Sequence, residues 1–213
     1  MIDTNPEVSE AARQAGFDVV CANGIEEPTL ARVGAETRAV CAGLTANETI
    51  NLLFARKIRE QFRGPAVGVA LEAGGGLTVE AVHDEGAQVL FGAPCGLRRW
   101  LYLASNGALS IETWVFHGGA SAGDSTAAIA AITSGAILPL VVARKRQVAM
   151  FDDGVRLSEG DRVVVAVAND EVAAAHARLQ AAGYGPAAPH EALLPSTPPR
   201  IEPSAPPSSA DGA

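Results

Sequence analysis

The sequence is poor in cysteine, in basic charge and in aromatic residues. Three scattered cysteines in 213 residues, with no C-x-x-C pair, suggest neither a disulfide framework nor a zinc site. A formal net charge of -8 and a pI near 5.0 argue against a surface that follows the phosphates of nucleic acid. The N-terminus has neither the basic nor the apolar region of a signal peptide. We therefore expect a cytoplasmic protein, in a reducing environment, with no nucleic-acid partner.

A recognisable catalytic or metal-binding pattern is also missing. The four histidines are far apart and share no ligand spacing, and Gly-Asp-Ser at 123–125 is not a G-x-S-x-G nucleophile elbow but a helix N-cap. The paired acids Glu26-Glu27 and Asp152-Asp153 are typical of turns, and adjacent side chains usually point apart. We expect neither catalysis nor a bound metal.

One uncharged stretch, residues 125–143, has about the length that spans a bilayer. Thr133-Ser134-Gly135 and Pro139 interrupt it and divide it into an alanine-rich helix and a buried strand. We favour the helix and strand, and a membrane span is the alternative.

Short apolar strands alternate with helices over the first 105 residues. Strands that are nearly all apolar predict a parallel sheet covered on both faces. The expected strands are at residue 2 and at 17–22, 39–42, 66–71 and 88–92, and the expected helices at 6–15, 26–33, 45–62, 78–85 and 96–104. Cys21 and Cys41 fall inside such strands, where a thiol usually packs as a small core residue.

The helix at 45–62 is the clearest local pattern. Thr45 to Glu48 has the form of a capping box, in which the hydroxyl and the carboxylate each bond a backbone N–H. Its apolar residues recur at helical spacing and predict the core face: Ile50, Leu53, Phe54, Ile58 and Phe62.

Gly74-Gly75-Gly76 precedes the helix expected at 78–85. A glycine-rich turn before a helix can cradle a phosphate with its backbone N–H groups. The run has neither the G-x-G-x-x-G spacing nor a Walker lysine, so a surface loop is the favoured interpretation.

The pattern of the sequence changes after residue 105. Short β-rich runs lie at 109–117, 136–143, 147–151 and 161–167, and helices are expected at 125–133 and 170–182. They predict a small α+β domain with a mostly antiparallel sheet at 106–184. Beyond it, eight of the 13 prolines lie between Pro186 and Pro207, which predicts a disordered tail at 185–213.

Polar residues follow several of the expected strands. Asp3, between a strand and a helix, stands where dinucleotide-binding folds place the acid that bonds the ribose, and Asn23 follows the next strand. Thr45, Asn47, Glu48 and Asn51 resemble the T-x-N-D-x-x-N signature of the N-terminal domain of the RCK/TrkA family, the regulators of potassium conductance.

The second half resembles the TrkA C-terminal domain. The strand at 136–143 is followed by Arg144, and Leu157, Gly160, Asp161 and Val163 form the L-x-x-G-D-x-V turn and strand typical of that domain. Together the two resemblances cover roughly residues 1–182. They imply a Rossmann-like domain at 1–105 followed by a TrkA-C-like domain.

The resemblance implies a non-catalytic regulatory module of potassium channels, potassium uptake systems or cation/proton antiporters, with the antiporter branch preferred. It implies dimers or larger rings, a membrane transporter partner in cis or in trans, and NAD(H), ATP or ADP as ligand. The candidate cofactor-binding residues are Asp3, Asn23, Thr45 and Asn47. The alternative is that they only cap turns and a helix.

The sequence departs from the family pattern at its start. The first strand and the G-x-G-x-x-G loop, which would bind the pyrophosphate, should precede Asp3. The predicted fold is therefore a truncated Rossmann-like parallel sheet, and its unpaired edge predicts self-association. An NAD-dependent oxidoreductase fragment and a non-catalytic interaction protein are the alternative functions.

Overall fold

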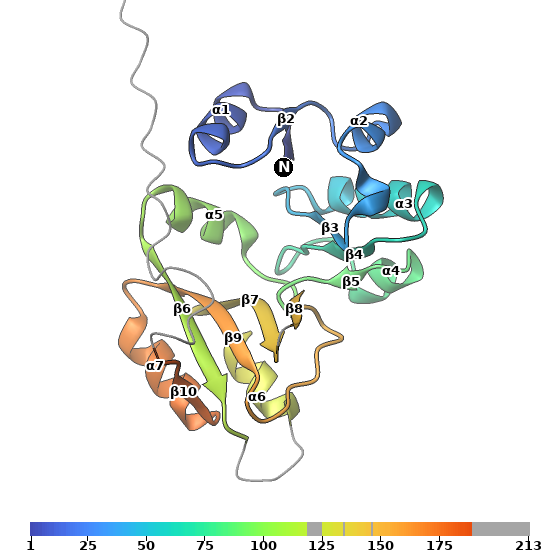
Figure 1. Cartoon of the computed structure of the whole chain (residues 1–213). Helices are drawn as coiled ribbons and strands as arrows, with labels where there is room; N and C mark the ends of the chain where they lie inside the picture. Colours follow the sequence, from blue (N-terminus) through green and yellow to red (C-terminus); the bar gives the residue numbers. More distant parts are fainter. Residues whose placement is uncertain (119–124, 134, 146, 189–213) are drawn as a thin grey trace, which may run out of the picture. The chain divides into compact units, whose positions relative to one another are not determined.

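The computed structural model describes residues 1–118, 125–133, 135–145 and 147–188 (Figure 1). These residues form two compact units, an N-terminal unit of residues 1–34 and a main unit that begins at Ala35. Gly123 and Asp124 of the predicted N-cap, and the part of the predicted tail beyond residue 188, lie outside the described residues.

The N-terminal unit is a β-α-β-α segment. It contains β1 (Ile2–Asp3), α1 (Pro6–Gln14), β2 (Val20–Cys21) and α2 (Glu27–Arg32), and β1 pairs parallel with β2. The strand predicted at 17–22 was too long, because β1 offers only two residues for pairing, and Phe17 is 59% exposed. Cys21 is exposed as well, so the prediction that it packs in a core was wrong.

The first part of the main unit continues the alternation of strands and helices. It contains a short 3₁₀ turn (Ala35–Thr37), then β3 (Val40–Gly43), α3 (Glu48–Gln61), β4 (Ala66–Val69), α4 (Val79–Asp84), β5 (Gln88–Val89) and α5 (Leu97–Ser105). The strands form a parallel sheet of order β3-β4-β5. The α/β class predicted for this half is confirmed, with the parallel strands divided between this sheet and the β1-β2 pair.

Helix α3 differs from the prediction in its cap and in its buried face. Asn47 is its N-cap, not Thr45, and the residues buried against the sheet are Asn51, Ala55 and Ile58, whereas Ile50 is 38% exposed. The reason is a close approach: a Cβ on Gly43 would lie 3.1 Å from the Cα of Asn51. At the close approach the sheet therefore meets Asn51, and of the predicted apolar face only Ile58 is buried.

The second part of the main unit is an antiparallel sheet of order β10-β6-β9-β7-β8 with two helices packed against it (Figure 1). Its elements are β6 (Leu109–Phe116), α6 (Ser125–Ile132), β7 (Ile137–Arg144), β8 (Gln147–Met150), β9 (Arg162–Ala168), α7 (Val172–Ala181) and β10 (Tyr184–Pro186). The predicted antiparallel α+β architecture is confirmed. Residues 185 and 186, predicted to belong to the tail, pair with Val115 and Trp114 of β6 instead.

The uncharged stretch at 125–143 divides into α6 and β7, as the favoured interpretation requires. Across the described ranges, no helix has the length and apolar character of a membrane span.

Both faces of the antiparallel sheet are covered. On one face, Ala128 and Ile132 of α6 and Leu179 of α7 pack with Val163 and Val165 of β9. On the other face, Leu138 and Ala166 pack with Trp100 of α5 and with Leu90 and Phe91 beyond β5.

This second core joins the two predicted domains. Backbone bonds reinforce it, since the Phe91 N–H donates to the Phe151 carbonyl at 2.7 Å and the Asp153 N–H donates to the Val89 carbonyl at 2.9 Å. A domain boundary between residues 105 and 106 stays a prediction, and in the structure the two halves share this core.

Candidate functional site

Asp3 and Asn23 lie at the carboxyl ends of the paired strands β1 and β2. Asp3 stands opposite Cys21 in the pairing, and Asn23 follows two residues later. An Asp3 carboxylate oxygen accepts the Asn5 N–H at 2.8 Å, and the Asn23 amide oxygen accepts the Ile25 N–H at 3.2 Å. Both side chains thus make local turn bonds, as the turn-capping alternative requires, and a role in ligand binding stays a prediction.

Thr45 and Asn47 belong to the main unit, in the exposed turn between β3 and α3. The Asn47 side chain accepts the N–H groups of Thr49 and Ile50 at 3.1 and 3.3 Å and so begins α3. The Thr45 hydroxyl accepts the Asn47 N–H at 3.2 Å and lies 2.8 Å from the Asn51 amide oxygen. The structure brings these two candidates together, and it describes Asp3 and Asn23 in the other unit.

Asn51 is the central polar side chain of this turn, and its role was not predicted. It is 1% exposed, and its amide oxygen accepts the Thr45 N–H at 2.8 Å. Its amide nitrogen donates to the carbonyls of Thr45 at 2.8 Å and of Ala70 at 3.0 Å. Asn51 therefore ties the ends of β3 and β4 together. Its place as the last residue of the T-x-N-D-x-x-N-like motif was the available signal.

The Glu48 carboxylate does not close the predicted capping box. It reaches the glycine-rich loop instead and accepts the N–H groups of Gly76 at 2.6 Å, Leu77 at 3.0 Å and Glu72 at 3.3 Å. A Cβ on Gly75 would lie 2.3 Å from a Glu48 oxygen, so the carboxylate fits only over glycine there. The loop amides can bind an anion, and the anion they bind is part of the chain itself.

Replacing Glu48 by alanine is expected to loosen this loop without unfolding the sheet. Three backbone N–H groups lose a charged acceptor, which should lower the free energy of unfolding by about 1–2 kcal/mol. Hydrogen exchange at the amides of Gly76 and Leu77 should accelerate at least about tenfold more than at Val69 in β4. An equal change at all three amides would contradict the role of Glu48 as a local anchor of the loop.

The L-x-x-G-D-x-V motif of the second half surrounds an ion pair. The Asp161 side chain is 1% exposed, and the Arg144 guanidinium donates to both of its oxygens at 2.8 and 2.7 Å. The Ser158 N–H donates to the same carboxylate at 2.8 Å. Burial raises the pKa of Asp161, but the bonds from Arg144 and Ser158 outweigh it and leave that pKa below its usual value. Both members of the pair belong to the residues that carry the TrkA-C resemblance.

Within the described ranges, no three histidine, cysteine or acidic side chains come together as a metal ion would require. His83 and Asp153 form a pair at 2.6 Å that connects α4 with the segment after β8.

Neither the family models nor the curated proteins contain a match to the chain. Similar solved structures exist. All three described here are of GsuK. The crystal structure of the GsuK RCK domain is 11% identical and has a TM-score of 0.33, with 78% of this chain and 38% of that chain covered.

The other two structures are of the whole channel. The GsuK channel is 18% identical with a TM-score of 0.35 and covers 81% of this chain and 33% of that one. The GsuK channel bound to NAD is 12% identical with a TM-score of 0.35, covering 85% and 34%. The chain thus spans about a third of the GsuK chains.

Proposed function

We propose that this protein is a regulatory ligand-binding module that controls the transport of a monovalent cation, either potassium or sodium in exchange for protons. The observation that carries the proposal is the turn between β3 and α3, where Asn51 joins two strand ends and leaves Thr45 and Asn47 exposed. Open parallel sheets bind their ligands at this carboxyl edge. The motifs around Thr45 and Asp161 support the same family of regulators.

The proposed ligand is a nucleotide of the NAD(H), ATP or ADP class. In the main unit, Thr45 and Asn47 supply a hydroxyl and an amide at the start of α3. In the N-terminal unit, taken by itself, Asp3 and Asn23 stay proposed ligand-binding residues, with the Asp3 carboxylate suited to ribose hydroxyls. Because Glu48 already accepts the N–H groups of Gly76 and Leu77, the glycine-rich loop is not the proposed phosphate site.

Regulation requires that the ligand bind one conformation more tightly than another. In the main unit, backbone bonds of Phe91 and Asp153 tie the parallel sheet to the antiparallel half, so a shift at one sheet has a direct path to the other. We propose that the readout is a change in a homo-oligomer at the cytoplasmic face of a membrane transporter, with the transporter in cis or in trans. An antiporter is the preferred partner.

Isothermal titration calorimetry with NADH, NAD, ATP and ADP tests the proposal. At least one nucleotide should bind, and Asn47→Ala should weaken that binding about tenfold, since one hydrogen-bonding side chain is worth about 1.4 kcal/mol. The control is Asn106→Ala, which also removes an exposed asparagine that bonds backbone, here the Tyr102 carbonyl at 2.8 Å. Absence of binding for all four nucleotides, or equal losses in the two variants, would refute the nucleotide role. Turnover of NADH with carbonyl substrates would favour the oxidoreductase alternative.

A further inference from the structure

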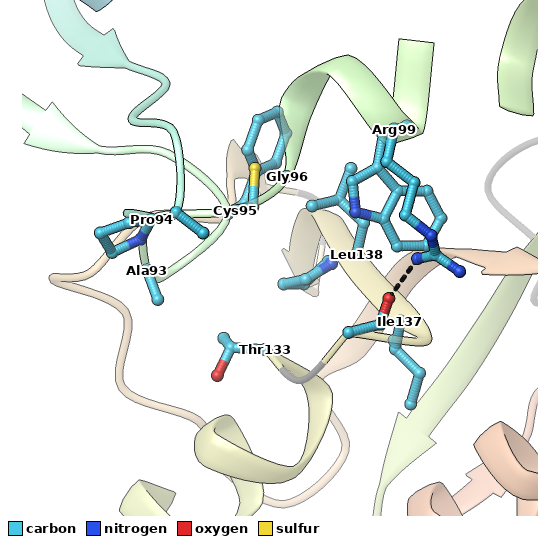
Figure 2. A pocket seen from close by; sticks show the side chains of 13 residues that line it. Ala93, Pro94, Cys95, Gly96, Arg99, Thr133, Ile137 and Leu138 are labelled. Carbon is cyan, nitrogen blue, oxygen red and sulfur yellow. Dashed lines mark hydrogen bonds between the residues drawn. The ribbon is translucent and has the colours of Figure 1, made fainter. Parts of the chain in front are cut away.

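A pocket of about 270 Å³ lies in the main unit, apart from the turn that carries Thr45 and Asn47 (Figure 2). Ala93 and Pro94 of the loop before α5 line it, together with Thr133 after α6 and Ile137 at the start of β7. The pocket therefore lies between the chain that leaves the parallel sheet and the chain that enters β7. A molecule inside it would contact both halves of the main unit.

The size of the pocket limits its occupant. Drug-sized ligands occupy cavities of about 300–1,000 Å³, so this pocket lies just below that range. It suits a small organic molecule better than a dinucleotide, and it is separate from the proposed nucleotide site.

Most of the pocket wall is apolar. Phe91, Trp100 and Leu138 contribute to it from the second core, and Cys95 adds a thiol. Burial, with the nearby Glu72 charge as a smaller cause, raises the pKa of Cys95 to about 11. At neutral pH this thiol is protonated and acts as a further apolar surface.

The polar end of the pocket is positively charged. Arg99 lines it and donates to the Gly135 carbonyl at 2.5 Å, the bond dashed in Figure 2, and to Glu171 at 2.7 Å. These two bonds use two of the five N–H donors of a guanidinium. Arg99 and Glu171 are exposed at 41% and 42%, so their ion pair is weak and leaves the cation available to another anion.

Helix α5 adds to this positive end. Its N-cap, Gly96, lines the pocket and offers no side-chain cap, and its first turn carries Arg98 and Arg99 but no acid. Cations at the positive end of a helix dipole are unfavourable, and an anion there offsets the effect.

The pocket wall also contains a residue in an uncommon backbone conformation. Phe91 has φ 65°, in the left-handed region that usually requires glycine. Such strain persists where surrounding structure demands it and is frequent at ligand sites.

We propose that this pocket binds a small monocarboxylate with an apolar body, its carboxylate at Arg99 and the start of α5 and its body against Phe91, Trp100 and Leu138. A ligand of this class would hold Ala93 and Pro94 of the loop before α5 together with Ile137 and Leu138 of β7. It would be a second effector site, independent of the nucleotide site.

Titration with 4-methylpentanoate, monitored through the NMR chemical shifts of the backbone amides, tests this site. The acid should shift the amides of Ala73, Ala93, Gly96 and Gly135 at concentrations up to about 10 mM. The matched neutral ligand, 4-methylpentanamide, should bind at least about tenfold more weakly, because it lacks the charge that Arg99 recognises.

Two variants complete the test. Arg99→Gln should lower the affinity for 4-methylpentanoate about tenfold. Arg98 is the adjacent arginine and does not line the pocket, so Arg98→Gln should change that affinity less than about twofold. Ala73→Phe places a ring at an exposed position of the pocket wall and should abolish binding, while Ala104→Phe on α5 should not. Melting temperatures identify any variant that does not fold. If Ala73→Phe does not fold, the result for Arg99→Gln decides whether the pocket binds the acid. Equal binding of acid and amide, equal effects of Arg98→Gln and Arg99→Gln, or no shifts in the pocket would overturn the proposal.

Discussion

Replacing Asn51 by alanine should lower the free energy of unfolding by about 3–4 kcal/mol, the largest effect expected for a single polar side chain here. Asn51 is 1% exposed and bonds the N–H, the hydroxyl and the carbonyl of Thr45 together with the carbonyl of Ala70. A buried group left without a partner costs about 1–3 kcal/mol, and the groups of the exposed Thr45 can turn to water in part. The buried Ala70 carbonyl has no such alternative.

Urea denaturation of Asn51→Ala beside Asn106→Ala measures this effect. Both variants remove an asparagine that bonds a backbone carbonyl, but Asn106 is exposed and should cost below about 1 kcal/mol. Asn51→Asp adds a discriminating comparison. It preserves shape and the acceptor but removes both donated bonds, so it should be about as damaging as alanine. A mild effect of aspartate would mean that Asn51 acts by volume and not by its hydrogen bonds.

Replacing Asp161 by asparagine should lower the free energy of unfolding by about 2–3 kcal/mol at neutral pH. The carboxylate is 1% exposed and bonds Arg144 twice, and asparagine cannot accept both of those bonds and the Ser158 N–H. The loss should stay at or below the lower end of the ~3–5 kcal/mol for a fully buried pair, because Arg144 is 51% exposed and water can bond it.

The pH dependence of this loss has a definite sign. Because the pKa of Asp161 is lower in the folded protein than in the unfolded chain, its stabilisation is complete above the unfolded value of about 3.9. This stabilisation disappears as the pH falls through the lower pKa of the folded protein. The difference in the free energy of unfolding between wild type and Asp161→Asn should therefore be constant from about pH 5 to 7 and shrink in more acidic solution.

The control is Glu10→Gln, which breaks the exposed pair with Arg13 and should change the free energy of unfolding by less than about 0.5 kcal/mol. A difference that grows on acidification would contradict the ion-pair account.

The alternation of apolar runs with turn residues was enough to predict the elements of both halves. It located α3, α5, β6, β7 and β9 to within a few residues, and it divided the uncharged stretch at 125–143 into helix and strand. Local periodicity decides these features, because each element must present an apolar face whatever it packs against. The ends of the strands were less predictable. Strands were expected at 17–22 and 88–92, whereas β2 and β5 are each two residues long, because the length of a strand depends on its partner strand.

The candidate site was predictable only in part. Thr45 and Asn47 were identified from a motif, but the capping box named Thr45 as the N-cap of α3, whereas the N-cap is Asn47. Both residue types are good N-caps, so the sequence does not separate them. Glu48 was assigned to the nearest backbone N–H group, whereas the structure gives it those of a loop more than twenty residues away. Local sequence motifs predict hydrogen bonds only between residues a few positions apart, so they do not predict this contact.

By itself, the sequence determined the order of helices and strands, the parallel character of the first half, the antiparallel character of the second and the polar residues at the strand ends. These follow from periods of two and 3.6 residues and from turn chemistry, which act within a few residues. Only the tertiary structure decided that Asn51 joins β3 to β4, that Arg144 bonds Asp161, and that Phe91 and Leu138 share a core beside an apolar pocket. The physical reason is that such contacts are selected by the packing of distant segments, where a hydrogen bond or an apolar contact depends on three-dimensional position and not on spacing along the chain.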